Sequence, residues 1–259
     1  MRDLPLRVPQ KEAASGMDHP LFVSWPSEGK VAANWGDKLN PILVQALSGR
    51  EVSNSKPATG WDGRSVYRVI GSGLANTRPH HEVWGMGFKF FSEKINAPPR
   101  KIHAVRGPLT RGKLISMGID CPGVFGDPAV LYPLIYYPTI QIVYDIGIIR
   151  HINEQELPED TFPISPEIHR LNIDITGEIN SVVDAILSCR MIVSSSLHGI
   201  IAAHAYGVPA FQRFGIRRRD CRPAMASSST IISQASESHR MSNAPLMGAE
   251  GYLGPNVTR

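Results

Sequence analysis

Short strand-like runs alternate with helix-like patterns over most of this chain, and that alternation limits the possible folds more than any other feature of the sequence. Runs with the length and the β-branched or aromatic content of strands lie at 21–25, 65–73, 81–88, 101–105, 139–149 and 191–195. Helix-like patterns lie between several of these runs. Strands that alternate with helices form βαβ units, so we predict an α/β fold with parallel sheets and helices on both faces.

Capping residues and periodicity locate two of the helices. Asn40 and Pro41 look like an N-cap residue followed by proline at the first helical position, and Gly49 stands where a left-handed residue would end the helix. We therefore predict a helix over 41–48. The segment 179–190 repeats apolar residues at i, i+3, i+4, i+7 and i+8, which is the spacing of an amphipathic helix.

The order of the elements divides the chain into four parts. Residues 1–20 are polar and interrupted by prolines, which is typical of a flexible N-terminal tail. We expect a first domain over 21–135 and a second over 139–214, joined by a hinge in the proline-bracketed stretch 133–139. Residues 215–259 are rich in serine and lack periodicity, so we expect an atypical and poorly ordered tail, as a truncated C-terminus or a shifted reading frame would leave.

Composition and cysteine spacing exclude several classes of function. The formal net charge is +4 with a pI near 9.0, but no basic stripe interleaved with aromatic residues accompanies it, so nothing indicates nucleic-acid binding. Cys121, Cys189 and Cys221 are far apart and lack a C-x-x-C pairing, which argues against a disulfide framework and a zinc site. We find neither a signal peptide nor an apolar run of about 20 residues, so we expect a cytoplasmic protein without a membrane segment.

The loop SSSLHG at 194–199 carries the most chemistry among the loops that follow predicted strands. One of Ser194 to Ser196 can cap the next helix, which places His198 in its first turn. A helix N-terminus binds anions and disfavours a cationic imidazole, so His198 is suited to hold a proton only when an anionic substrate is bound. The alternative is a serine cap with an incidental histidine.

Four further loops hold candidate residues, each with a plainer alternative. Arg106 ends a strand, and its guanidinium fork matches the two oxygens of a carboxylate or phosphate, although Arg106 and Arg111 would look the same as solvated surface charges. NWGD at 34–37 supplies an amide and a carboxylate, but a local Asx turn has the same sequence. GSGLAN at 71–76 is an incomplete dinucleotide motif. Asp127 is a candidate catalytic residue, although an aspartate before a proline is more often a turn residue.

Five motifs follow one another in a fixed order within 21–214: NWGDKLN, GSG, RGPLTR, GDPAVLYP and SSLHGIIAAHAYGVP. This ordered set resembles the polysaccharide pyruvyltransferase family, and most closely its members in bacterial exopolysaccharide synthesis, such as succinoglycan pyruvyltransferases. The resemblance implies two Rossmann-like domains that face a cleft, as in GT-B glycosyltransferases. It also implies transfer of a pyruvyl group from phosphoenolpyruvate to two hydroxyls of one sugar as a cyclic ketal, with release of phosphate.

The same resemblance assigns roles to residues. His198 is the implied catalytic acid. We expect the donor, phosphoenolpyruvate, to be bound by Arg106, Arg111, Ser196, Leu197 and Gly199. We expect the acceptor side of the cleft to be lined by Asn34, Gly36, Asp37, Gly71, Ser72, Gly73 and His151. Relatives usually have a proline where this chain has Arg150, and neither a metal nor a cofactor is implied beyond the co-substrate phosphoenolpyruvate.

The implied partners are phosphoenolpyruvate and a sugar or lipid-linked oligosaccharide acceptor. A lipid-linked acceptor would bring a cytoplasmic protein to the inner face of the cytoplasmic membrane through its substrate. Two alternatives stay open at this point. The first is a sugar-nucleotide glycosyltransferase on the same fold, because a helix N-terminus accepts a diphosphate equally well. The second is a non-catalytic, glycan-binding member with a defective C-terminus.

Overall fold

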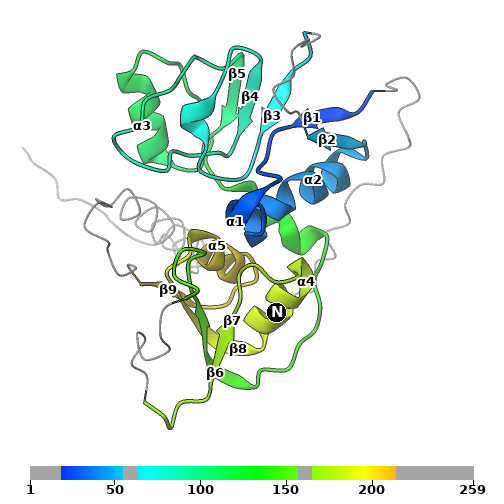
Figure 1. The fold of residues 1–259 in the computed structure, drawn as a ribbon, viewed down its shortest axis with the longest axis vertical. Helices are drawn as coiled ribbons and strands as arrows, with labels where there is room; N and C mark the ends of the chain where they lie inside the picture. Colours follow the sequence, from blue (N-terminus) through cyan, green and yellow to red (C-terminus); the bar gives the residue numbers. More distant parts are fainter. Residues whose placement is uncertain (1–18, 55–62, 157–164, 214–259) are drawn as a thin grey trace, which may run out of the picture.

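The computed structural model describes residues 19–54, 63–156 and 165–213 (Figure 1). They form two sheets, with strand orders β2-β1-β3-β4-β5 and β7-β6-β8-β9, in which all neighbouring strands are parallel. The prediction of an α/β fold with parallel sheets is confirmed. The expected tails, 1–20 and 215–259, lie outside the described residues except for residues 19 and 20.

The strands are short and the helices connect them. The strands of the first sheet are β1 (Leu21–Val23), β2 (Val52–Asn54), β3 (Val66–Arg68), β4 (His81–Trp84) and β5 (Lys101–Ala104). Those of the second sheet are β6 (Tyr144–Ile149), β7 (Arg170–Ile173), β8 (Cys189–Ser194) and β9 (Ala210–Gln212). The α-helices are α1 (Gly29–Ala32), α2 (Trp35–Ser48), α3 (Pro108–Ser116), α4 (Ile179–Leu187) and α5 (Leu197–Ala205), and the 3-10 helices are η1 (Leu74–Asn76) and η2 (Pro128–Leu134).

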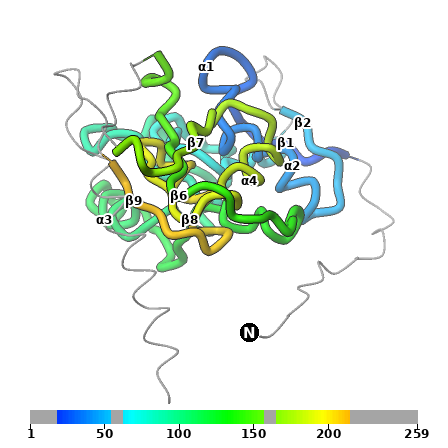
Figure 2. Tube along the Cα trace, turned by 90° about the horizontal axis from the view of Figure 1, so that it is seen from below, coloured from blue at the N-terminus to red at the C-terminus, as the bar shows by residue number. Residues whose placement is uncertain are grey.

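The two sheets lie toward opposite ends of the long axis (Figure 1), and they overlap when the molecule is seen from below (Figure 2). Helix α2 lies between them. By sequence α2 belongs to the first sheet, because it connects β1 with β2, but its buried Leu39 and Leu43 share one hydrophobic core with Ile149 of β6 and Ile186 of α4. Burial of this apolar surface is the main stabilising contribution to the contact between the halves.

Hydrogen bonds fix the direction in which α2 enters this core. The backbone N–H of Trp35 donates to the carbonyl of Ile175 at 3.0 Å, and the indole Nε1 donates to the carbonyl of Ile179 at 3.2 Å. Lys38 donates through Nζ to the carbonyl of Thr176 at 2.9 Å. The N-terminus of α2 is therefore anchored to the second half of the molecule.

The start of α2 differs from the sequence prediction. The helix begins at Trp35 with Asn34 as its N-cap, and Pro41 lies inside it, so the prediction that Asn40 caps a helix over 41–48 is wrong. Pro41 has no N–H for the carbonyl of Asp37, one turn earlier. The side chain of Asn40 supplies the missing donor, through Nδ2 at 3.1 Å, which is why a proline is tolerated here. The predicted end is confirmed, because Gly49 is left-handed with φ 66°.

The segment between the sheets also differs from expectation. A strand was predicted over 139–149, but β6 begins only at Tyr144, which pairs with Cys189 at the start of β8. Ile142 and Val143 belong to no strand pair, although the N–H of Val143 donates to the carbonyl of Ser188 at 2.8 Å, and each side chain is 56% exposed. The predicted hinge over 133–139 does connect the two sheets, and Tyr206 donates through its hydroxyl to the carbonyl of Tyr136 at 2.6 Å. Motion at this segment stays a prediction.

Replacement of Asn40 should destabilise the fold strongly. Its amide is fully buried and also pairs with Ile70, donating to the carbonyl at 3.3 Å and accepting from the N–H at 2.9 Å. Asn40→Leu leaves three buried backbone groups without partners, so we expect a loss of about 3 kcal/mol or more in the free energy of unfolding, measured by urea denaturation. Gln45→Leu, at an exposed position of the same helix, should change it by less than about 0.5 kcal/mol. Equal effects of the two substitutions would contradict this account.

Candidate active site

A pocket of about 510 Å³ lies where the carboxyl ends of strands from both sheets come together. Each of the four loops singled out from the sequence, NWGD, GSG, RGPLTR and SSSLHG, contributes at least one residue to it, as expected for parallel sheets. The lining residues are Ser24, Trp25, Pro26, Val31, Asn34, Asp37, Arg68, Ile70, Gly71, Ser72, Gly73, Asn76, Met86, Phe88, Lys89, Arg106, His151, Ile152, Asn153, Ser196, Leu197 and His198.

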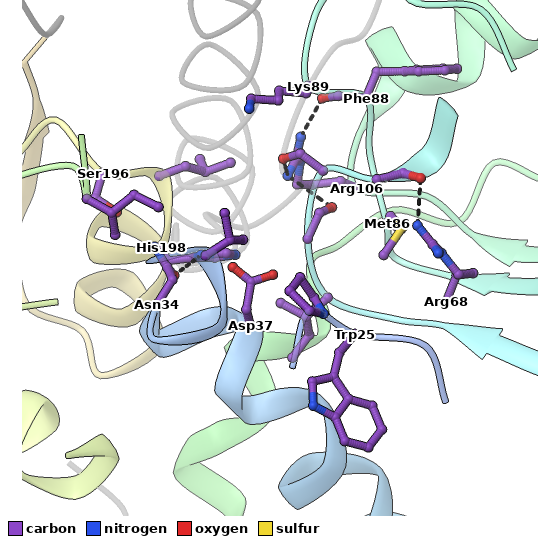
Figure 3. Close-up of a pocket in the computed structure, with 18 of the residues that line it drawn as sticks. Trp25, Asn34, Asp37, Arg68, Met86, Phe88, Lys89, Arg106, Ser196 and His198 are labelled. Carbon is purple, nitrogen blue, oxygen red and sulfur yellow. Dashed lines mark hydrogen bonds between the residues drawn. The ribbon is translucent and has the colours of Figure 1, made fainter. Parts of the chain in front are cut away.

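His198 is held by a hydrogen bond that determines its tautomer. Its Nδ1 lies 2.6 Å from Oδ1 of Asn34, and the same oxygen accepts the backbone N–H of Gly36 at 3.1 Å (Figure 3). A backbone N–H can only donate, so the Asn34 atom is the amide oxygen and Nδ1 of His198 must carry a hydrogen. In the neutral ring, Nε2 then has a free lone pair. It is buried and has no hydrogen-bond partner among the described residues.

The surroundings of His198 disfavour its cationic form. Burial, followed by the charges of Arg106 and His151, lowers its pKa to about 3. The direction agrees with the sequence expectation for the free protein. The main cause is burial rather than the helix N-terminus, and Ser196 at the N-cap of α5 makes no side-chain capping bond. An anion bound beside Arg106 would offset the positive charges of Arg106 and His151, which are two of the three causes of the low pKa.

Arg106 follows β5 and is held by neutral acceptors. It donates to Oγ of Ser72 at 2.9 Å, to the carbonyl of Phe88 at 3.0 Å and to the carbonyl of Gly71 at 3.4 Å. These contacts exclude the alternative of a solvated surface charge. A guanidinium has five N–H groups, so two remain for a ligand. Arg106 is therefore a positioned cation with spare donors in the pocket.

Two carboxyl groups lie close to this cation. Asp37 lines the pocket at 8% exposure, and Figure 3 shows its carboxyl group pointing into the space between His198 and Arg106. Burial, together with the charge of Asp127, raises the pKa of Asp37 to about 7. Burial also raises the pKa of Asp127 to about 6, although Arg106 and the N–H of Ala129 lower it. Near neutral pH the pocket thus contains a carboxyl group that exchanges its proton readily.

Three glycines make room for the pocket's nitrogen-bearing side chains. A Cβ on Gly36 would lie 2.4 Å from the ring of His198, and a Cβ on Gly87 would lie 2.7 Å from the guanidinium of Arg106. A Cβ on Gly73 would lie 2.5 Å from the guanidinium of Arg68. Distances below 3.0 Å require a displacement, so these positions set where the three side chains can lie.

Most of the residues expected at the site from the sequence lie in the pocket, but three do not. Gly36 and Gly199 lie behind it: Gly36 packs under His198, and Gly199 packs against Ser194 and Ile149. Arg111 points elsewhere, because its Nε donates to the carbonyl of Cys121 at 2.9 Å. The expected binding of the donor by Arg111 therefore has no support in the structure. The roles of the residues that do line the pocket stay predictions.

Sequence reasoning missed other pocket residues. Arg68 is the last residue of β3, and its side chain lines the pocket beside Ser24. Trp25 and Lys89 also follow strands of the first sheet. The rule that ligands bind at the carboxyl ends of parallel strands could have identified them. Asp127 is not among the lining residues. The sequence favoured a turn role over a catalytic one for it, and its Oδ1 does cap η2 by accepting the N–H of Ala129 at 3.1 Å. Its second oxygen is buried without a partner among the described residues.

Comparison with known proteins adds an independent observation. The profile of the family described as polysaccharide pyruvyl transferase matches residues 71–211, more than half of the chain. The chain belongs to the polysaccharide pyruvyl transferase family. The part that matches this pyruvyl transferase profile includes Arg106, His151 and His198 and begins after the NWGD loop.

Two relatives show similarity over 68% of this chain. The succinoglycan biosynthesis protein ExoV of Rhizobium meliloti is 30% identical over 182 residues, which is 54% of its own length. An uncharacterized protein of Acanthamoeba polyphaga mimivirus is 28% identical over 180 residues, or 62% of its length. This member of the pyruvyl transferase family thus spans less than two thirds of either relative.

Within residues 19–54, 63–156 and 165–213, every helix is too short or too polar to cross a membrane. No group of three or more His, Cys, Asp or Glu side chains there is arranged to hold a metal ion.

The raised pKa of Asp37 predicts a pH-dependent gain in stability for Asp37→Asn. The native pKa of about 7 exceeds the ordinary 3.8, so the native state loses stability as the pH rises from about 4 through 7. Asparagine does not ionise and so lacks this penalty. In urea denaturation, the free energy of unfolding of the variant should exceed that of the wild type by roughly 2–4 kcal/mol at pH 8 and equal it near pH 4. Asp120→Asn, at an exposed position, is the control and should change the free energy of unfolding by less than about 0.5 kcal/mol. A gain that is equal at both pH values would contradict the account.

Gly87→Ala should displace the guanidinium of Arg106 and weaken anion binding at least about tenfold, since a charge-assisted hydrogen bond contributes about 1.5–3 kcal/mol. Inorganic phosphate, titrated by calorimetry, is the probe. Gly112→Ala is the matched control, because nothing lies within 4 Å of a Cβ there. Unchanged phosphate affinity in a folded Gly87→Ala protein would show that the position of Arg106 does not govern anion binding.

Proposed function

We propose that this chain transfers the pyruvyl group of phosphoenolpyruvate to two hydroxyls of one sugar in a polysaccharide or in its precursor, forming a cyclic ketal and releasing phosphate. We further propose that the two sheets with their helices act as two Rossmann-like domains facing the pocket, in a GT-B-like arrangement. The observation that carries the proposal is the juxtaposition of a positioned guanidinium, Arg106, with His198 and Asp37 at the carboxyl ends of both sheets. Membership of the family supports the same reaction.

Donor binding is the first step that this geometry supports. Arg106 has two spare N–H groups, which suit two oxygens of a phosphate or carboxylate. Negative charge brought next to His198 raises the pKa of the imidazole from its low value in the free protein. Nε2, which has a free lone pair, then takes up a proton. Asp37 is a suitable source, because its carboxyl group keeps a proton up to about pH 7.

Once His198 carries this proton, the bonds of phosphoenolpyruvate change in three steps. His198 gives it to the methylene carbon of phosphoenolpyruvate, which leaves an oxocarbenium-like centre at C2. One sugar hydroxyl attacks C2 and passes its proton to the Asp37 carboxylate, so that the acid is restored. The second hydroxyl then attacks C2, the bond from C2 to the phosphate oxygen breaks, and phosphate leaves with the second hydroxyl proton. Acid catalysis and the positioning of two hydroxyls supply the rate enhancement.

Thermal-shift titration tests the choice of donor. Phosphoenolpyruvate should raise the Tm more than inorganic phosphate or a sugar nucleotide at equal concentration, because only the native state binds it. Arg106→Met should abolish the shift, whereas Arg190→Met, which removes an exposed charge paired with Asp145, should retain it. Stabilisation by the sugar nucleotide alone would refute the proposal and favour glycosyl transfer.

His198→Ala should lower the rate of acceptor-dependent phosphate release by about 10² to 10⁴, the usual contribution of a positioned acid, without loss of the folded state. The reaction is followed by phosphate release from phosphoenolpyruvate with a glycan acceptor. His169→Ala, at an exposed histidine outside the pocket, should leave the rate unchanged. A near-normal rate for His198→Ala would remove His198 from the chemistry.

A further inference from the structure

Arg68 is a second cation of the pocket, and no acid among the described residues balances its charge. It donates through Nη1 to Oγ of Ser24 at 3.1 Å and through Nη2 to the carbonyl of Gly73 at 2.7 Å. Its Nε is buried and has no hydrogen-bond partner in the part of the chain that the structure describes. Burial lowers its pKa to about 10, and no carboxylate among the described residues opposes that shift.

A cation removed from water needs a counter-charge, because desolvation of an unpaired ion costs several kcal/mol. Arg106 has Asp127 nearby to offset part of this cost, but Arg68 has neutral partners only. If Arg68 only joined the end of β1 to the GSG turn, an uncharged hydrogen-bond donor would serve as well, so a purely structural role does not explain the charge. The side chain also lines the pocket, and Gly73, which has no Cβ, gives its guanidinium room there. The missing counter-charge is therefore best supplied by a ligand.

Arg68 and Arg106 hold neighbouring residues of one turn. Arg106 bonds to Gly71 and Ser72, and Arg68 bonds to Gly73. Figure 3 shows both guanidinium groups on the same wall of the pocket, with Met86 between them. Gly71, Ser72 and Gly73 are consecutive, so both guanidinium groups are bonded to a segment of only three residues.

We propose that Arg68 forms a second anion subsite, and that the pocket takes a small molecule with two anionic groups, one on each guanidinium. The inference rests on the proposed function where it names the ligand, since phosphoenolpyruvate carries a phosphate and a carboxylate on one carbon. Inorganic phosphate satisfies only one of the two subsites. Arg68 thereby distinguishes the donor from its own product, which aids phosphate release after transfer.

The test compares ligands with one and two anionic groups. Calorimetric titrations use phosphoenolpyruvate, pyrophosphate and inorganic phosphate on the wild-type protein, on Arg68→Met and on the control Arg190→Met. Arg68→Met should weaken the binding of phosphoenolpyruvate and of pyrophosphate about 10- to 150-fold, and the binding of inorganic phosphate less than about threefold. Gly73→Ala should reproduce this selective loss, because its Cβ would displace the Arg68 guanidinium without removing a charge.

Equal weakening of all three ligands, or no weakening, would overturn the inference. Loss of acceptor binding with unchanged affinity for phosphoenolpyruvate would also overturn it, since the second anion would then belong to the acceptor. A wild-type protein that binds pyrophosphate but not phosphoenolpyruvate would defeat the proposed function instead. In that case the pyrophosphate titrations of Arg68→Met and Gly73→Ala would still decide the role of Arg68: a loss of pyrophosphate affinity that is larger than the loss of phosphate affinity would support a second anion subsite, and equal losses would overturn it.

Discussion

The hydrogen bond between Asn34 and His198 joins the two halves of the molecule at the point where the proposed chemistry occurs. Asn34 caps α2, which follows the first strand of one sheet, and His198 lies in the first turn of α5, which follows a strand of the other. The bond exists because Trp35 anchors α2 to the backbone of Ile175, and because Gly36 leaves space for the imidazole. The tautomer of the imidazole, and hence its chemistry, thus depends on how α2 packs.

The charges in the pocket are costly in the free protein. Two guanidinium groups, the carboxyl group of Asp37 with its raised pKa and the imidazole of His198 with its lowered pKa line one cavity. Such perturbed groups gather at functional sites, where the stability lost in the free protein is recovered when the ligand binds. An anion with two charged groups would neutralise the cations and favour the protonated imidazole. The same arrangement that destabilises the empty pocket therefore prepares His198 to act as an acid.

The sequence predicted the parallel α/β fold and the four pocket loops because both follow from local patterns. It failed where tertiary contacts decide: the start of α2 depends on the side chain of Asn40 replacing an N–H that Pro41 lacks, and the start of β6 depends on its partner β8. Arg68 was missed for a related reason. An arginine at the end of a strand looks ordinary until the fold places its side chain in the wall of a cavity.

In the proposed reaction, an anionic donor converts His198 from a neutral base into an acid. ¹⁵N NMR of histidine-labelled protein at pH 7 measures this directly, with His198→Ala used to assign the signal. We predict a neutral ring with the hydrogen on Nδ1 in the free protein, and an imidazolium once phosphoenolpyruvate is bound. An imidazolium already present without ligand, or a ring that stays neutral at saturating phosphoenolpyruvate, would contradict the account.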